Sequence, residues 1–455
     1  DISIAGATFI GRDVTLAADQ SLIGSTIDSV DDGFYDLVLE SRQRTRLGGL
    51  VGQSRPLGSL ATGTSGDMLI DTTLVATRGD QRYNVPLTFT QGTKAKPLEL
   101  FSQNGDIEFA STISAGVNAK GAHRSLDIEA TAGNVLVRDL IGISLAGVKF
   151  GDYASAKDTN PYGLRIAAAD IWLLADVTTF ETQRYVGRVH IGNNGINGLT
   201  RKLISLDPSV VFEGTVDDTV ALTHRLDVRA VTTEPSNGIL PEVRFSGGIG
   251  QSIQLASVGA FAGIQSRGAD AVAGQILIEP PAMRFGVVSI DGDVSTGGDQ
   301  TYVGGSIEIG GNGGKPVSLY SENGTITLIA RPGSLAGLRN GGNLDILLGD
   351  NATLSLETLD LIARSGLSLA DVVTYVGFYG SALASGATAV GGASLGQSVA
   401  SQNADQSLAT SAEAQASNEV LIEAEVDVGE IEAEQCLPPT GDVGPATGTD
   451  SSSCS

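Results

Sequence analysis

Residues 96–110 read KPLELFSQNGDIEFA, and residues 315–329 read KPVSLYSENGTITLI. Lys-Pro, Ser and Asn-Gly occupy the same places in both stretches, and apolar residues alternate with polar ones around them. A Gln-x-Tyr triplet stands upstream of each copy, at residues 81–83 and 300–302. Both landmarks recur at one and the same offset, since Tyr83 lies as far from Tyr302 as Lys96 does from Lys315. Two separate landmarks that share one offset indicate an internal repeat.

A weaker copy lies between these two. Residues 183–185 read QRY and are followed by KLISLDPSVVF at residues 202–212. AHRSLDIEA at residues 122–130 is likewise echoed, with a slip of one position, by LTHRLDVRA at residues 222–230. The repeating unit is therefore roughly 90 to 120 residues long and occurs a little over three times.

The texture of residues 1–365 favours many short strands. The chain of 455 residues contains 60 Gly, and only 5% of its residues are aromatic, which is unlike the core of a large enzyme. Segments such as DIEFA (106–110) and SIEI (306–309) alternate apolar and polar residues, as strands with one buried face do. Clusters of Gly, Asn, Asp and Ser between them supply turns. No comparably clear helical period is present, so we predict an all-β fold.

Asn-Gly between two alternating runs is a strong hairpin signal. It also fits a corner of a coil whose strands stack in parallel, and the local sequence does not decide between the two. A propeller would show a blade period of roughly 40 to 50 residues, which the chain lacks. A compact sandwich does not need the same phrase at two such distant places, whereas a solenoid tolerates repeats of uneven length. We therefore expect a parallel β-helix over residues 1–365, with ~20 to 25 residues in each coil.

The rest of the chain divides into two segments. Residues 366–418 are rich in small residues and amides, which predicts a low-complexity linker. Residues 419–455 begin with an alternating acidic run, typical of an edge strand, and contain the only two cysteines, Cys436 and Cys454. An isolated pair around a short polar segment predicts a disulfide loop formed in an oxidising compartment, with two free thiols as the alternative.

Charge and hydropathy exclude several classes of protein. The net charge of −24 argues against nucleic-acid binding, which needs clustered Lys and Arg, and is equally unfavourable on an anionic membrane. No run approaches the roughly 18 apolar residues of a membrane-spanning helix. The first residues, DISIAGATFIG, lack the pattern of a signal peptide. We expect the chain to be a piece of a longer protein, with a removed signal peptide as the alternative.

No residue pattern predicts catalysis, a metal or a cofactor. His123 and His224 occupy near-equivalent repeat positions and His190 stands alone, without the convergent partners that ligation or acid–base chemistry needs. The Gly-rich run at residues 304–314 lacks the context of a dinucleotide or phosphate loop. Acidic pairs such as Asp217-Asp218 follow no calcium-binding pattern and are interpreted as solvated loops. We predict a protein without catalytic, cofactor or metal residues.

The repeated residues themselves are interpreted as structural. Equivalent positions in a solenoid stack on one another or fill the same corner, so the recurring tyrosines are expected to form a ladder rather than a platform for sugars. The Asn-Gly pairs are expected at the turns. The predicted repeat-ladder residues are Tyr83, Tyr185, Tyr302, Asn104, Gly105, Asn323 and Gly324.

Several of these phrases resemble repeats of a known family. GGDQTYVGGSIEI, VVFEGTVDDTVAL at residues 210–222, and the pair LVGQSRPLGSL (50–60) and GIGQSIQLASV (248–258) are similar to repeats of filamentous haemagglutinin-like exoproteins. The resemblance covers most of residues 1–365. Those proteins are secreted by the two-partner pathway and fold as right-handed parallel β-helices. The resemblance implies an extracellular adhesin or filament at the bacterial cell surface, exported through an outer-membrane β-barrel transporter.

Cys436 and Cys454 look like the C-terminal cysteine loop that tethers some high-molecular-weight adhesins of this pathway to their transporter. The resemblance then implies the membrane-proximal, C-terminal portion of an exoprotein whose partners are that transporter and a host, abiotic or neighbouring-cell surface. One alternative is a subunit that self-associates into an extracellular filament or sheath. The other is a polysaccharide-degrading enzyme on a β-helix, which requires clustered carboxylates, whereas Asp and Glu are scattered here.

Overall fold

The structure, a computed structural model, describes residues 1–93, 96–115, 124–142, 162–179, 181–195, 199–206, 209–232, 240–264, 286–310, 317–330, 335–336, 344–349, 351–364 and 372–375. In this part of the chain nearly all regular structure is β-strand, and the strands pair in parallel. The predicted all-β parallel class is thus confirmed. One helix was not expected, α1 (Leu356–Arg364), which packs on β31 (Thr325–Ile329) through Thr358.

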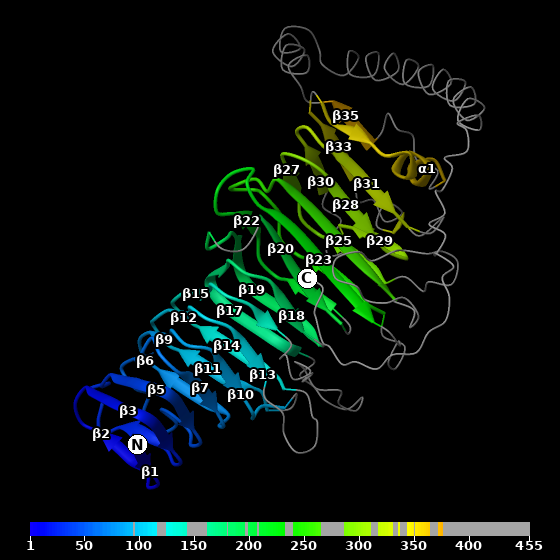
Figure 1. Cartoon of the computed structure of the whole chain (residues 1–455). Coiled ribbons are helices and arrows are strands. Elements are labelled where there is room, and N and C mark those ends of the chain that lie inside the picture. Colours follow the sequence, from blue (N-terminus) through cyan, green and yellow to red (C-terminus); the bar gives the residue numbers. More distant parts are fainter. Residues whose placement is uncertain are drawn as a thin grey trace, which may run out of the picture. The chain divides into compact units, whose positions relative to one another are not determined.

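The strands lie in three columns, here called A, B and C, and the chain visits them in that order, circuit after circuit (Figure 1). One such circuit is here called a coil. Column A runs through the first halves of β3 (Val14–Ile23) and β5 (Leu37–Leu47), then β6 (Leu60–Thr62), β9 (Gln81–Tyr83), β12 (Ile107–Phe109), β15 (Val135–Val137), the second halves of β17 (Tyr162–Leu173) and β19 (Thr182–Ile191), β22 (Val216–Asp218), β27 (Val294–Thr296), β30 (Val317–Ser321), β33 (Leu344–Leu348) and β35 (Val373–Tyr375).

The other two columns are built in the same way. Column B contains β1 (Ile2–Ile4), the second halves of β3 and β5, β7 (Asp67–Ile70), β10 (Leu87–Phe89), β13 (Ile113–Ala115), β16 (Ile141–Gly142), β18 (Val177–Thr179), β20 (Thr200–Ser205), β23 (Arg225–Thr232), β25 (Ser257–Ile264), β28 (Gln300–Val303), β31 and β34 (Thr353–Leu354). Column C contains β2 (Thr8–Ile10), β4 (Ile27–Ser29), β8 (Leu74–Thr77), β11 (Leu98–Ser102), β14 (Leu126–Ala130), the first halves of β17 and β19, β21 (Ser209–Phe212), β24 (Glu242–Phe245), β26 (Val287–Ile290), β29 (Ser306–Ile309) and β32 (Leu335–Ala336).

The length of one coil varies widely. In column A, Ile171 pairs with Val189, which makes a short coil, whereas Ile249 is bridged to Val294, which makes a coil more than twice as long. The expected coil of ~20 to 25 residues is therefore too narrow a range. Because the columns keep their register through these changes, additional residues are accommodated between the strands. The stack also continues past residue 365, where the linker was expected to begin, because β35 pairs with β33.

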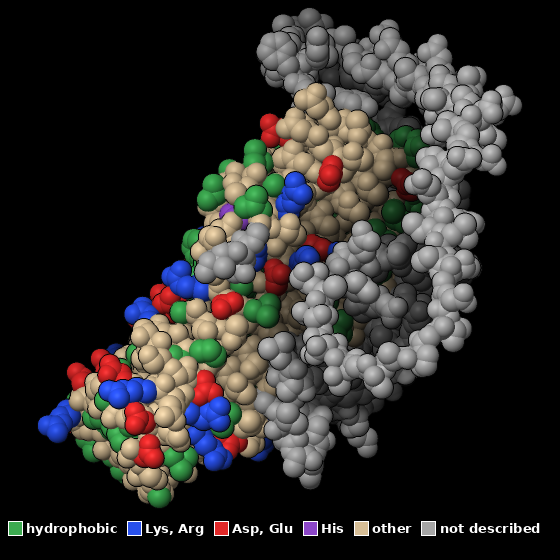
Figure 2. All heavy atoms as spheres, in the orientation of Figure 1, with side chains coloured by type: hydrophobic (Ala, Val, Ile, Leu, Met, Phe, Trp, Pro, Cys, Tyr) green, Lys and Arg blue, Asp and Glu red, His purple; other side chains and the backbone are tan. Residues whose placement is uncertain are grey.

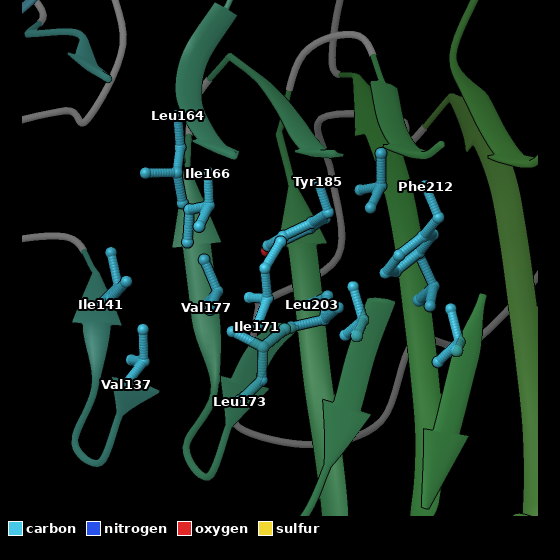
Figure 3. Packing of buried hydrophobic residues seen from close by; sticks show 14 of the residues in the cluster. Val137, Ile141, Leu164, Ile166, Ile171, Leu173, Val177, Tyr185, Leu203 and Phe212 are labelled. Atoms are coloured by element: carbon cyan, nitrogen blue, oxygen red, sulfur yellow. The ribbon is translucent and has the colours of Figure 1, made fainter. Parts of the chain in front are cut away.

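Side chains alternate along each strand, so that every second one points into the space that the three columns enclose. In β11, Leu98 and Leu100 are buried, whereas Glu99 between them points outward. Figure 3 shows the interior where side chains from all three columns meet, with Ile166 from column C, Leu173 from column A and Leu203 from column B. Burying one such side chain stabilises the fold by about 1.5 to 3 kcal/mol, and the continuous interior repeats this contribution in every coil.

The outer surface carries acidic and basic side chains in close proximity. Figure 2 shows Asp and Glu interspersed with Lys and Arg on the visible face. Charged side chains pair between neighbouring coils, as Arg44 does with Asp67 and Arg165 with Asp127. In the described residues no helix is long and apolar enough to cross a membrane.

Candidate binding groove and the recurring turns

The Gln-x-Tyr triplets form one hydrogen-bonded arrangement. Tyr83 is fully buried and its hydroxyl donates to Oε1 of Gln81 at 2.8 Å. Nε2 of Gln81 donates to the carbonyl oxygen of Phe101 in column C at 2.7 Å. Each buried polar atom of the pair thereby gains a partner, which an apolar interior requires. The same two bonds join Tyr185, Gln183 and Ile204 (2.8 and 2.8 Å) and Tyr302, Gln300 and Tyr320 (3.2 and 2.6 Å).

The three tyrosines lie in three different columns rather than in one shared ladder. Tyr83 is in column A and stacks on Phe109 with 5.2 Å between ring centroids. Tyr185 is in column C and stacks on Phe212 at 5.1 Å. Tyr302 is in column B, in register between Ala260 and Leu328. The offset from Tyr83 to Tyr302 is therefore not a whole number of coils. The sequence repeat reproduces the turn that leads into a column, and that turn is used at all three transitions between columns.

The Asn-Gly pairs complete this turn in the following coil. Asn104-Gly105 lies between β11 and β12, and Asn323-Gly324 lies between β30 and β31, so neither pair closes a hairpin. Each glycine N–H donates to a buried serine hydroxyl at 2.9 Å. A Cβ on Gly105 would stand 2.3 Å from the carbonyl carbon of Gly79, one coil earlier. Glycine is needed here for the close stacking of two turns, not for a left-handed backbone.

The buried tyrosines should make the fold sensitive to alkali. Burial raises the pKa of Tyr83, Tyr185 and Tyr302 far above the ordinary value of about 10. Their hydroxyls therefore stay protonated in the folded chain while those of the unfolded chain ionise, so stability is fully present below pH 10 and is lost above it. Each tyrosine should contribute a slope of about 1.4 kcal/mol per pH unit.

Urea unfolding of the wild type and of Tyr302→Phe between pH 8 and 12 measures this slope. Because phenylalanine does not titrate, the free energy of unfolding should fall less steeply above pH 10 in the variant than in the wild type, by about 1.4 kcal/mol per pH unit. This difference in slope is expected whatever the stability of the variant at pH 8. Equal slopes for both proteins would contradict the assignment of this tyrosine as a buried neutral phenol.

The histidines and the acidic pairs have structural partners. Nδ1 of buried His224 contacts Oδ1 of Asp218, and Nε2 of His190 lies 2.7 Å from Oδ1 of Asp170. Asp217 accepts the backbone N–H of Ser252 at 2.8 Å and thereby holds the turn at residues 250–253. Within the described ranges no group of three His, Cys, Asp or Glu residues could hold a metal ion. His123, Cys436 and Cys454 lie outside these ranges.

A row of outward-facing side chains along column A forms the candidate surface site. Register places Arg82, Glu108, Leu136, Trp172 and His190 next to one another on five successive strands. These strands follow the alternation rule, because each named residue stands between two buried neighbours or beside one. Trp172 is the only tryptophan of the chain, and its ring is stacked on His190 with 4.4 Å between centroids.

The polar groups beside Trp172 are held in fixed positions by one another. Glu108 accepts Nε of Arg138 at 2.7 Å and Nε of Arg82 at 2.9 Å, one guanidinium on each carboxylate oxygen. Burial by itself raises the pKa of Glu108, but the hydrogen bonds and charges of these two arginines outweigh it and lower that pKa below its ordinary value. Asp106 accepts both the backbone N–H and the side-chain amide of Asn134, at 2.8 and 3.1 Å.

These side chains line a hollow of about 310 Å³ over β9, β12, β15 and β17. Its lining includes Arg82, Asp106, Glu108, Leu136, Arg138 and Trp172. A second hollow, of about 670 Å³, extends over β6 and β9 and shares Asp80 and Arg82 with the first. We call the two together the Trp172 groove. Sequence reasoning did not identify this groove, although the alternation in DIWLLA already places Trp172 on the outward side of its strand.

Comparisons with known proteins identified no relative of the chain. No family model, no curated protein and no solved structure matches the chain.

Proposed function

We propose that the chain is the shaft of an extracellular or cell-surface structural and adhesive protein, built as a right-handed parallel β-helix. The observation that carries the proposal is the parallel pairing of successive coils in three columns, from β1 to β35. Right-handedness is favoured because a connection between parallel strands is almost always right-handed in proteins.

The architecture suits a mechanical role. Each coil packs only on its neighbours, so length can be added coil by coil at ~4.8 Å each without a new kind of contact. Carboxylates reinforce the stack from coil to coil, as when Asp80 accepts the backbone N–H of Asp106 at 3.0 Å and Asp299 that of Thr325 at 2.8 Å. We infer a non-catalytic function, since each carboxylate of the smaller hollow already has a protein partner. Glu108 accepts from two arginines, Asp106 accepts from Asn134, and Asp80 accepts the backbone N–H of Asp106.

The proposed location and anchoring rest on features of the sequence. The resemblance to filamentous haemagglutinin-like exoproteins supports export by an outer-membrane β-barrel transporter, and the net charge of −24 would keep neighbouring shafts apart. In this proposal Cys436 and Cys454 close the loop that retains the protein at the cell surface.

Thiol labelling of intact cells that produce the full-length protein tests this proposal, with Cys454→Ser and the neighbouring control Ser455→Ala alongside. We expect an oxidised pair, labelled only after reduction, and release of Cys454→Ser into the medium at least tenfold above wild type or the control. Free thiols, or a Cys454→Ser variant that stays on the cells, would contradict anchoring. Ordered polymers of purified protein in electron micrographs would instead support the filament alternative.

A further inference from the structure

We propose that the Trp172 groove binds a chain of neutral sugars. The inference deepens the adhesive role proposed above and rests on it only for its biological setting. The binding itself is a property of the groove and can be measured on the purified chain. A measurement of sugar binding therefore tests the groove independently of export and anchoring.

Trp172 lines the groove on one side of its stacking contact with His190. The register places β17 between β15 and β19, with Leu136 on one side of Trp172 and His190 on the other. The imidazole of His190 covers one face of the indole, at an interplanar angle of 21°. The hollow lies on the Leu136 side, because its lining comes from β9, β12, β15 and β17 and does not include His190. Trp172 and Leu136 together give this hollow an apolar floor, against which the C–H face of a sugar ring can pack.

Polar groups surround this floor at positions that their partners fix. A sugar hydroxyl both donates and accepts, so a site for it needs acceptors and donors together. Asp106 and Glu108 supply carboxylate oxygens, and Asn134 and Arg138 supply N–H groups. Because Glu108 bridges two guanidiniums and Asp106 holds Asn134, these groups are ordered before a ligand arrives, which lowers the entropy cost of binding.

The balance of charge favours a neutral ligand. Three carboxylates line the first hollow, those of Asp80, Asp106 and Glu108, against the two guanidiniums of Arg82 and Arg138. Both guanidiniums already donate to Glu108, so an anionic sugar would meet a net negative surface. The first hollow extends over four neighbouring strands, or ~15 Å, and it shares Asp80 and Arg82 with the second. That length fits several linked rings better than a single monosaccharide.

The intrinsic fluorescence of the chain reports this site directly, because Trp172 is its only tryptophan. Purified wild-type protein would be titrated with neutral hexasaccharides of glucose, mannose, xylose and N-acetylglucosamine, and with polygalacturonate and heparin. Calorimetry gives the affinities independently. We expect at least one neutral hexasaccharide to shift the emission and to bind with an affinity that changes less than twofold between 50 and 500 mM salt.

Variants assign the binding to the groove. Trp172→Ala and Glu108→Gln should each weaken the neutral ligand at least tenfold by calorimetry, and Trp172→Phe should weaken it less than Trp172→Ala. Phe261→Ala is the matched control, because Phe261 is an outward-facing aromatic on β25 in column B, and it should bind within twofold of wild type. Circular dichroism and thermal melting verify that each variant is folded.

Three outcomes would overturn the inference. The first is that no neutral hexasaccharide changes the fluorescence or gives heat up to 5 mM. The second is that only the anionic polymers bind, with an affinity that falls steeply as salt is added. The third is that Phe261→Ala weakens binding as much as Trp172→Ala does.

Discussion

Replacing Tyr185 by alanine is expected to destabilise the fold by about 4 kcal/mol. The side chain is fully buried on the inner side of column C and stacks on Phe212. Phe212 stacks in turn on Phe245 at 5.1 Å, so the substitution opens a cavity at the start of a row of three rings. The row cannot close over the gap, because each ring belongs to a separate strand fixed by its own pairing.

Tyr185→Phe separates packing from hydrogen bonding. The ring remains, but Oε1 of Gln183 loses the hydroxyl that donates to it, and a buried acceptor left without its partner costs about 1 to 3 kcal/mol. Urea unfolding followed by circular dichroism at pH 7 measures both variants. Leu199→Ala is the control, because Leu199 is 52% exposed and should change stability by less than about 0.5 kcal/mol. A Tyr185→Ala variant as stable as that control would contradict the described packing.

Replacing Gly105 by alanine is expected to destabilise the fold by about 3 kcal/mol, a large effect for one methyl group. Its Cβ would lie 2.3 Å from the carbonyl carbon of Gly79 and 2.4 Å from the backbone nitrogen of Asp80. Both contacts are with backbone atoms of the preceding coil, which cannot swing aside as a flexible side chain would. Either the two turns separate or the hydrogen bond from Gly105 N–H to Ser102 is lost.

Gly6→Ala is the matched control, because no atom lies within 4 Å of a Cβ placed at Gly6. The same chemical change there should leave stability unchanged or raise it by up to about 1 kcal/mol, since alanine restricts the unfolded chain. Thermal melting of both variants beside wild type makes the comparison. If both alanines have the same effect, the close stacking of the turns at Gly79 and Gly105 is not what requires glycine.

The sequence repeat does not give the number of coils, because similar phrases lie in different columns. Gly52 and Gly250 open matching turns, and in both the backbone is left-handed, with φ of 68° and 65°. Each turn is held by a carboxylate one coil earlier, Asp28 in column C and Asp217 in column A. The matching phrases therefore mark the same kind of turn in two different columns. A count of coils taken from the phrases alone would be wrong by a fraction of a coil.

The sequence by itself determined the local structure. Strict alternation in segments such as Asp106 to Ala110, without a clear helical period, identified strands with one buried face and the all-β class. The same phrase at two distant places favoured a parallel stack over a sandwich. The recurring Gln-x-Tyr and Asn-Gly elements were recognised as structural, and the Asn-Gly pairs were placed at turns. These features depend on neighbours within a few positions, which is why sequence patterns can reveal them.

Only the tertiary structure decided which residues share a face. Coils as different in length as 171–189 and 249–294 shift the phase of the repeat, so Tyr83, Tyr185 and Tyr302 fall in three columns. The same variation made the groove hard to predict, because Arg82 and Trp172 are far apart in the sequence and line one hollow only through the register of four successive strands. Register is set by backbone pairing and by how each inserted loop returns to its column, and neither is encoded at the positions that finally line the site.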